Sequence, residues 1–221
     1  MNKNELEKPL NGAIKIGRKD HINALQKEGH LYCNSVKYFR LVEQEDFNRH
    51  DAREGAYKTK VVDKPEEFNL YFEDERVSKK IEFMKTQEFD LSKENFKLFC
   101  LFGVKRKHAI GKAFVDKKAL EFGEKALLIT DLIEFIERVK SSLHELNIDF
   151  KWGHVKYYKE SGVNENLTEF DKPDIFEHQN EFRLLIKEKS ITPFSFKIGS
   201  IEDISILYDT NDLKKITLLK Q

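Results

Sequence analysis

The stretch FKLFCLFGV at residues 96–104 limits most strongly what this chain can fold into. It carries one charged residue, Lys97, and is otherwise apolar. An apolar run of this length between polar segments is typical of a central strand that is covered on both faces. Phenylalanine occurs 18 times in the chain, mostly at strand-like positions. We therefore expect an α+β fold dominated by a strongly packed, mainly antiparallel sheet with a few helices.

The length of the chain predicts one domain over residues 1–221. The chain has 221 residues and shows no internal repeat or linker-like segment. Residues 1–13 are polar and are interrupted by Pro9 and by Asn11–Gly12, so we expect an N-terminal arm there. The first strand is predicted to follow this arm, at residues 13–16.

Charge and cysteine content exclude several classes of protein. Lysine plus arginine and aspartate plus glutamate number 39 each, which argues against a large basic surface for duplex nucleic acid. Cys33 and Cys100 lie in apolar or strand-like surroundings and are predicted to be reduced core residues of an intracellular protein. No window approaches 18 continuous apolar residues, and the N-terminus lacks an apolar signal segment. We expect a cytoplasmic protein with no membrane partner.

Periodicity and capping residues predict the elements along the chain. Asp20 is expected to cap a helix that ends at Gly29, and residues 30–40 are expected to return as a strand. Helices are further predicted after Asp116, reaching Phe122, and from Asp131 to Leu146. The remaining strands are predicted at residues 57–62, 68–72, 77–83, 96–104, 125–130, 149–158, 176–188, 194–198, 204–208 and 215–219.

The strand predicted at 176–188 contains the clearest candidate for chemistry. Side chains two apart on a strand share a face, so Gln179, Glu181 and Arg183 should project together while Phe182 packs into the core. A carboxylate beside an amide and a guanidinium can grip a sugar hydroxyl and stabilise a nearby positive charge. The alternative is an ordinary solvent-facing pair of Glu181 and Arg183, since such pairs are common on strands.

Two stretches near the N-terminus suggest a nucleotide. Gly17 and Arg18 would leave backbone N–H groups and a cation at a strand-to-helix turn, which suits a phosphate, although an ordinary turn is the alternative. Tyr38 could stack on a ring, and Arg40 could pair with Glu54 or with phosphate. Alternatively the aromatic side chains are core and the pair of Arg40 and Glu54 is structural. The charged segment 41–55 is either a solvated connection or the rim of a site.

Motifs for other chemistries are weak. The seven histidines form no paired i,i+4 ligand motif, the cysteines are far apart, and no phosphate-binding or nucleophile motif occurs, so no metal site is predicted. Asp149 and Lys151 have the spacing found in some metal-dependent nucleases. This spacing is too common to identify a nuclease.

Several segments, taken together, resemble a widespread bacterial family that looks like an offshoot of the ADP-ribosyltransferase fold of toxins and phage-defence systems. The resemblance covers roughly residues 13–207. The residues that carry it are Ile14–Arg18, Gly29–Ser35, Tyr38–Arg40, Glu43, Asp51, Glu54–Gly55, Phe122–Gly123, Phe135–Arg138 and Gln179–Arg183.

The resemblance implies a split antiparallel sheet and roles for particular residues. The opening segment would wrap the nicotinamide and its ribose, with Arg18 at the pyrophosphate and Tyr38 stacked on the nicotinamide. Glu181 would hold the nicotinamide ribose, and Gln179 would orient the incoming acceptor. The sequence departs from the enzymes' pattern in having Lys15–Ile16 before Gly17 and Arg18 after it, and Asn34–Ser35 is the nearest candidate for their Ser-Thr-Ser motif.

The leading expectation is therefore an NAD-dependent ADP-ribosyltransferase-like toxin or phage-defence effector. Its site would contain Glu181 and Gln179 as catalytic residues, NAD bound by Gly17, Arg18, Ser35, Tyr38 and Arg40, and substrate contacts from Glu54 and Arg183. Expected partners are a macromolecular acceptor, with RNA, DNA and protein left open, and an antitoxin or regulator protein. The alternatives are a non-catalytic binding module on the same fold, which the departures favour, and a metal-dependent nuclease.

Overall fold

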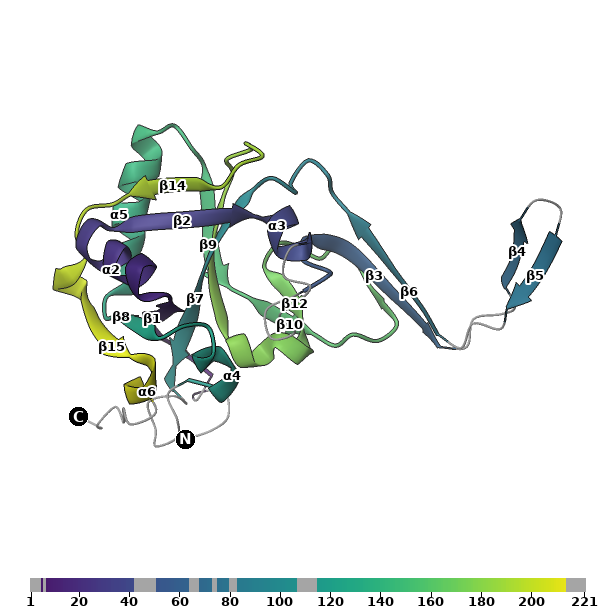
Figure 1. Ribbon diagram of the computed structural model, residues 1–221, viewed down its shortest axis with the longest axis horizontal. Coiled ribbons are helices and arrows are strands. Elements are labelled where there is room, and N and C mark those ends of the chain that lie inside the picture. Colours follow the sequence, from purple (N-terminus) through teal and green to yellow (C-terminus); the bar gives the residue numbers. More distant parts are fainter. Residues whose placement is uncertain are drawn as a thin grey trace.

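The computed structural model describes residues 5, 7–41, 51–63, 68–72, 75–79, 83–106 and 115–213. They form an α+β protein with mainly antiparallel sheets and few helices, as the sequence predicts (Figure 1). The helices are α2 (Lys19–Glu28), α3 (Val36–Leu41), α4 (Lys117–Leu120), α5 (Leu132–Glu145), α6 (Thr210–Leu213) and the 3-10 helices η3 (Asp174–Gln179) and η4 (Glu202–Ile204). The strands are β1 (Pro9–Gly17), β2 (His30–Ser35), β3 (Ala56–Asp63), β4 (Phe68–Phe72), β5 (Glu75–Lys79), β6 (Phe83–Phe89), β7 (Lys97–Lys105), β8 (Lys125–Ile129), β9 (Phe150–His154), β10 (Lys156–Tyr158), β11 (Val163–Asn164), β12 (Asp171–Pro173), β13 (Glu181–Ile186), β14 (Phe194–Lys197) and β15 (Ser205–Asp209).

Strand β7 is the centre of the main sheet, as its composition predicts. The sheet runs β14-β2-β7-β1-β8-β15, and β13 joins β7 to the edge strand β9. On one side, β13 pairs with β7 continuously, from Glu181 opposite Phe102 to Ile186 opposite Lys97. The other side of β7 is shared by two strands, β2 and β1.

The sheet splits between β2 and β1. Strand β2 pairs with the beginning of β7, where Asn34 lies opposite Leu98, and β1 pairs with its end, where Ile14 lies opposite Phe102. Between these two ladders neither β1 nor β2 pairs with residues 99–101, and the Lys15 ammonium donates to the Cys100 carbonyl at 2.7 Å. Over residues 30–33, β2 pairs with β14 instead. A gap therefore opens in the sheet beside the middle of β7.

One face of the main sheet carries the larger core, which α2 and α5 cover. Helix α5 buries a stripe at helical spacing that includes Phe135, Val139 and Leu143, and the Asp131 side chain caps its start by accepting from the Glu134 N–H at 3.0 Å. Phe182, Leu184 and Ile186 of β13 face this core, as their alternation predicts.

The opposite face carries two smaller clusters instead of one core. The first packs Ile14 and Phe102 against α4 and α6, and the second packs Leu98 and Leu185 against α3. Glu181 and Arg183 of β13 share this face with Leu185, because side chains two apart on a strand point the same way. The fold thus places charged side chains on the face where the apolar core is interrupted.

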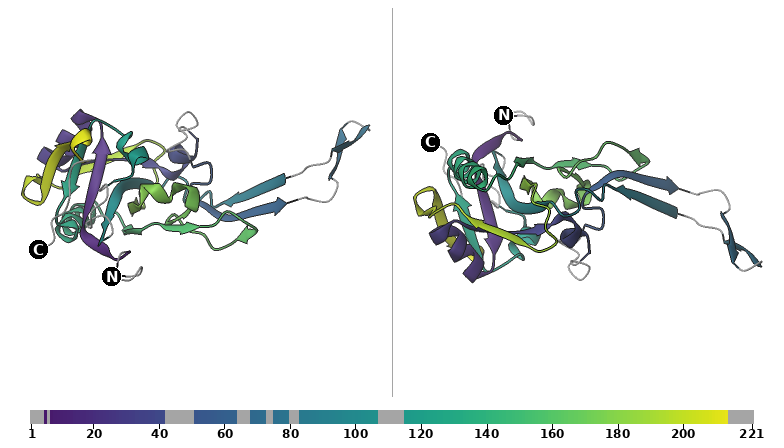
Figure 2. Two further views of the ribbon diagram at one scale, coloured as in Figure 1. Left: turned by 90° about the horizontal axis from the view of Figure 1, so that it is seen from below. Right: turned by 90° about the horizontal axis from the view of Figure 1, so that it is seen from above.

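A two-stranded ribbon of β3 and β6 projects from the body (Figures 1 and 2). Strand β11 pairs with the β3 part of this ribbon, and the hairpin of β4 and β5 lies beyond it. The short parallel pair of β10 and β12 lies beside the base of the ribbon and brings Lys172 next to β13.

Several local predictions are wrong for identifiable reasons. Residues 9–13 belong to β1 and are not part of an arm, because β7 and β8 supply ladder partners for them. Residues 36–41 form the helix α3, since the Ser35 hydroxyl accepts from the Tyr38 N–H at 3.0 Å and ends the strand. Asp20 lies in the first turn of α2, and Arg18 occupies the N-cap position.

Other predictions are confirmed, and some concern residues outside the described ranges. Gly29 ends α2 in the left-handed conformation, with φ of 60°, and Asp116 caps α4 by accepting from the Lys118 N–H at 2.9 Å. Both cysteines are free. Residues 1–4, 42–50, 107–112 and 215–219, on which parts of the predicted arm, loops and last strand fall, are outside the described residues. Within the described ranges, no helix combines the length and the apolar character needed to cross a membrane.

We expect Gly123→Ala to destabilise the protein, because a Cβ at this position would collide with the backbone of Gly17 at the end of β1. The neighbouring atoms are main chain and cannot rotate away, so the free energy of unfolding should fall by about 1–3 kcal/mol. Chemical denaturation measures this change. Gly153→Ala is the matched control, since its Cβ would meet only the Phe170 ring at 3.9 Å. Equal stability of the two variants would contradict the close packing of Gly123 on Gly17.

Candidate active site

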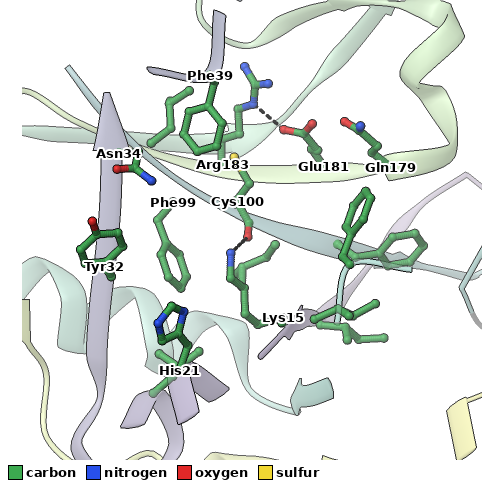
Figure 3. A pocket seen from close by; sticks show the side chains of 18 of the residues that line it. Lys15, His21, Tyr32, Asn34, Phe39, Phe99, Cys100, Gln179, Glu181 and Arg183 are labelled. Atoms are coloured by element: carbon green, nitrogen blue, oxygen red, sulfur yellow. Dashed lines mark hydrogen bonds and ion pairs between the residues drawn. The ribbon is translucent and has the colours of Figure 1, made fainter. Parts of the chain in front are cut away.

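A cavity of about 560 Å³ opens at the split in the sheet (Figure 3). Strands β1, β2, β7 and β13 and helix α2 all contribute to its wall. Much of the lining is apolar and includes Ile14, Leu25 and Phe99. A volume of this size is within the range of sites for small molecules and cofactors. The cavity exists because residues 99–101 of β7 lack a strand partner on this side.

Glu181 and Arg183 form the polar part of the cavity wall. Both are buried, with exposed fractions of 8% and 1%. The Arg183 Nε donates to Glu181 Oε2 at 2.6 Å, and its two terminal nitrogens donate to the Glu54 carboxylate at 2.7 and 2.8 Å. The prediction that Glu181 and Arg183 share a face is confirmed, and the alternative of a solvent-facing pair is wrong.

Lys172 completes this group of charges. No pattern in the sequence points to it apart from the break at Lys172–Pro173. Its ammonium donates to Glu181 Oε1 at 2.7 Å and lies 3.9 Å from Glu54 Oε2. The side chain is buried and stands 4.7 Å from the centre of the Phe176 ring. We call Glu54, Lys172, Glu181 and Arg183 the buried charge network. Two cations thereby neutralise two carboxylates away from water, which is the condition for burying them.

Gln179 reaches the same place from a different element. It ends the 3-10 helix η3 and is not on the strand, because Asn180 turns the chain with φ of 39° before β13 begins. Its amide oxygen accepts from the Lys172 ammonium at 2.7 Å. Gln179 is thereby tied to the buried charge network through the same cation that holds Glu181.

The network moves the pKa values of its carboxyl groups apart. Burial by itself would raise the pKa of Glu181, but Arg183 and Lys172 outweigh it and hold this pKa well below the usual range. Burial is the dominant cause for Glu54 and raises its pKa above the ordinary value, against the pull of Arg183. Glu181 therefore stays ionised over the whole physiological pH range.

Aromatic and polar side chains form the side of the cavity that lies opposite Glu181. His30, Tyr32 and Asn34 alternate along β2 and line the cavity, while Leu31 and Cys33 between them are buried in the core. The His21 ring of α2 is stacked with that of Tyr32 at a centroid distance of 6.3 Å. Figure 3 shows Tyr32 and His21 across the cavity from Glu181 and Gln179.

The cavity collects most of the residues that the sequence singles out. Those that line it are Gly17, Arg18, Tyr38, Glu54, Gln179, Glu181 and Arg183. Arg18 lies at its edge with a largely exposed side chain that pairs with Asp20 at 3.0 Å. Tyr38 packs edge-on against Phe39, with ring centroids 5.5 Å apart.

Ser35 and Arg40 are the two predicted site residues that do not line the cavity. The Ser35 hydroxyl is used at the start of α3. Arg40 pairs with Glu94 at 3.0 Å and stacks over the Phe89 ring at 4.1 Å, so the predicted pair of Arg40 and Glu54 is wrong. At the described end of the 41–55 segment Asp51 and Glu54 are buried, Ala52 is exposed, and Glu54 lines the cavity, as expected for the edge of a site.

The residues considered for metal chemistry lie elsewhere. Asp149 is exposed and pairs with Lys187 at 3.2 Å, and Lys151 lies exposed on the edge strand β9. Over the part of the chain that the structure describes, no cluster of three or more histidine, cysteine, aspartate or glutamate side chains is arranged to hold a metal ion. Neither residue contributes to the cavity at the split.

Comparison with known proteins adds no relative from which a function can be transferred. No protein-family model matches the chain, and neither the curated proteins nor the solved structures contain a match. Function is therefore inferred from the residues of the cavity.

We expect Arg183→Met to destabilise the protein severely, because it leaves the carboxylates of Glu54 and Glu181 buried with Lys172 as their only cation within the network. Breaking a fully buried ion pair in this way costs about 3–5 kcal/mol. Urea denaturation of the purified variant measures the change. Arg106→Met is the matched control, since Arg106 forms a partly exposed pair with Glu5 and its loss should cost less than about 1 kcal/mol. Similar losses in both variants would contradict the network's role.

The depressed pKa of Glu181 predicts how stability falls in acid. Above about pH 5 the carboxyl is ionised in both the folded and the unfolded state, so its contribution is fully present. Below about pH 4 the unfolded chain takes up a proton that the folded protein does not, and the free energy of unfolding falls as pH approaches the folded pKa. We expect Glu181→Gln to lose less stability than the wild type between about pH 6 and pH 3. Urea titrations at several pH values test this, and parallel acid curves would contradict it.

Proposed function

We propose that this protein is an NAD-dependent ADP-ribosyltransferase that modifies a macromolecule. The observation that carries the proposal is an ionised carboxylate, Glu181, buried in the wall of a cavity that the split sheet opens. A split antiparallel sheet is also the arrangement that the resemblance to ADP-ribosyltransferases implies. The same resemblance supports a role as a toxin or phage-defence effector, and the two free cysteines suit the reducing cytoplasm.

The side chains around the cavity fit NAD as the donor. The apolar wall and the Tyr38 ring provide flat contact surface for a nicotinamide ring. Lys15 of β1 and Arg18 of the turn between β1 and α2 supply cations for a pyrophosphate. The Glu181 oxygens accept one hydrogen bond each from Arg183 and Lys172, and a carboxylate oxygen can accept a second bond from a ribose hydroxyl.

Glu181 would act by stabilising charge in the transition state. Breaking the bond between C1′ of the ribose and the nicotinamide nitrogen sends the bonding electron pair to nicotinamide and leaves oxocarbenium character on the ribose. A fixed negative charge next to the ribose stabilises this cation more than it stabilises neutral sugar, and this difference is what accelerates the reaction. The acceptor then bonds to C1′ and loses a proton, so no oxidant or reductant is needed.

The other network residues would position this carboxylate. Lys172 and Arg183 each hold one Glu181 oxygen, so the carboxylate can neither rotate nor take up a proton near neutral pH. Glu54 would act indirectly by fixing Arg183 through two hydrogen bonds. Gln179, whose carbonyl oxygen accepts from Lys172, would orient the incoming acceptor, which is the role that the resemblance implies for it.

We expect Glu181→Gln to reduce nicotinamide release from NAD by about 10²–10³-fold, the usual effect of removing one preorganised electrostatic contact. The substitution keeps the shape of the side chain but removes the charge that meets the oxocarbenium. The measurement is nicotinamide release with purified protein, with and without cellular RNA, DNA or protein as acceptor. Wild-type protein that releases no nicotinamide with any of these would favour a non-catalytic binding module instead.

The control must account for stability, because Glu181→Gln also disturbs the buried network. Leu143→Ala serves this purpose, since Leu143 is fully buried in α5, does not line the cavity, and its truncation costs about 2–5 kcal/mol. Both variants are assayed at a temperature where circular dichroism shows them folded. Nicotinamide release should persist in Leu143→Ala and be lost in Glu181→Gln. Equal loss in both would contradict a chemical role for Glu181.

A further inference from the structure

Tyr32 is an exposed aromatic residue on the cavity side of β2. Its neighbours Leu31 and Cys33 point into the core and are completely buried, whereas 49% of the surface of Tyr32 is accessible. The side chain lines the cavity at the split and is stacked with His21 at an interplanar angle of 29°. Two nearly parallel rings at the edge of a cavity form a surface on which a flat heterocycle can stack.

The cavity has different chemistry at its two sides. The side formed by β13 carries Glu181, and Figure 3 places Tyr32 and His21 across from it. Lys15 extends between them and places its ammonium 4.5 Å from the centre of the Phe99 ring. The order from one side to the other is therefore carboxylate, cation and stacked rings. A dinucleotide presents ribose, phosphates and base in this same order.

We propose that Tyr32 and His21 form a stacking site for the adenine ring of the donor, so that the cavity selects a dinucleotide over a mononucleotide. This inference rests on the proposed function, which puts the nicotinamide ribose at Glu181 and hence the adenosine half at the opposite side. Tyr32 supplies most of the surface, because it is the larger ring and projects directly from the strand. Asn34, two residues along β2 on the same face, is placed to bond to polar atoms of the ligand.

Equilibrium binding of three probes tests the site: ADP-ribose, AMP and nicotinamide mononucleotide. We expect Tyr32→Ala to weaken ADP-ribose and AMP about 5- to 100-fold, the effect of losing one base-stacking ring, and to leave nicotinamide mononucleotide within about twofold. Tyr32→Phe keeps the ring and should bind all three probes like the wild type. Trp152→Ala is the matched control, because Trp152 is also an exposed aromatic residue on a strand but lies outside the cavity.

The outcomes separate this inference from the proposed function. If wild-type protein releases nicotinamide but Tyr32→Ala binds ADP-ribose and AMP normally, the adenine site is refuted and the enzyme assignment stands. Loss of transfer to an acceptor with unchanged ADP-ribose binding would also refute it, since the rings would then serve the acceptor. If AMP binding depends on Tyr32 but NAD is never cleaved, the stacking site stands and the enzyme assignment fails. No binding of any probe would overturn both.

Discussion

The structure depends on how one edge of strand β7 is divided. On one side of β7, strand β13 pairs with residues 97–102 without interruption. On the other side, β2 and β1 pair with the two ends of β7 and leave residues 99–101 without a strand partner. Backbone groups without a strand partner inside a fold must form other hydrogen bonds, and here the Lys15 ammonium donates to the Cys100 carbonyl. A cavity, a cation and a central strand are thereby brought to one place by topology alone.

Charge burial is the second requirement of this arrangement. Glu54, Glu181, Lys172 and Arg183 are each at most 8% exposed, and none of them would be stable there without the others. Such a network contributes little net stability, because desolvation of its members offsets their attraction. The network instead fixes the position of the Glu181 carboxylate. Lys172 and Arg183 each donate to one of its oxygens, and Lys172 also orients Gln179. A site that must stabilise developing positive charge needs a carboxylate of this kind.

The sequence predicts elements well where a periodic apolar pattern and a local cap agree. Strand β7, helix α5 with Asp131 and the left-handed Gly29 are examples, as is the shared face of Glu181 and Arg183. It fails where a tertiary partner decides the outcome. Residues 36–41 have strand-like side chains but become α3 once Ser35 caps them, and the 3-10 helix η3 takes the first residues of the strand predicted at 176–188, whose remainder is β13. No pattern in the sequence links Lys172 to Glu181 or Arg183 to Glu54, since these contacts require the complete fold.

The pair of Arg183 and Glu54 joins residues that are 129 positions apart in the chain. Lys172 and Glu181 belong to the same late part of the sequence, so during synthesis Glu54 emerges long before any cation of the network. Until then its carboxylate has to remain in water, and the segment around it cannot settle into its final position. Closing so long a loop is slow and entropically costly, and the reward comes only when all four charges meet. The contacts among Lys172, Glu181 and Arg183 are local in sequence, whereas the contribution of Glu54 to the candidate site must wait until the late part of the chain has folded against it.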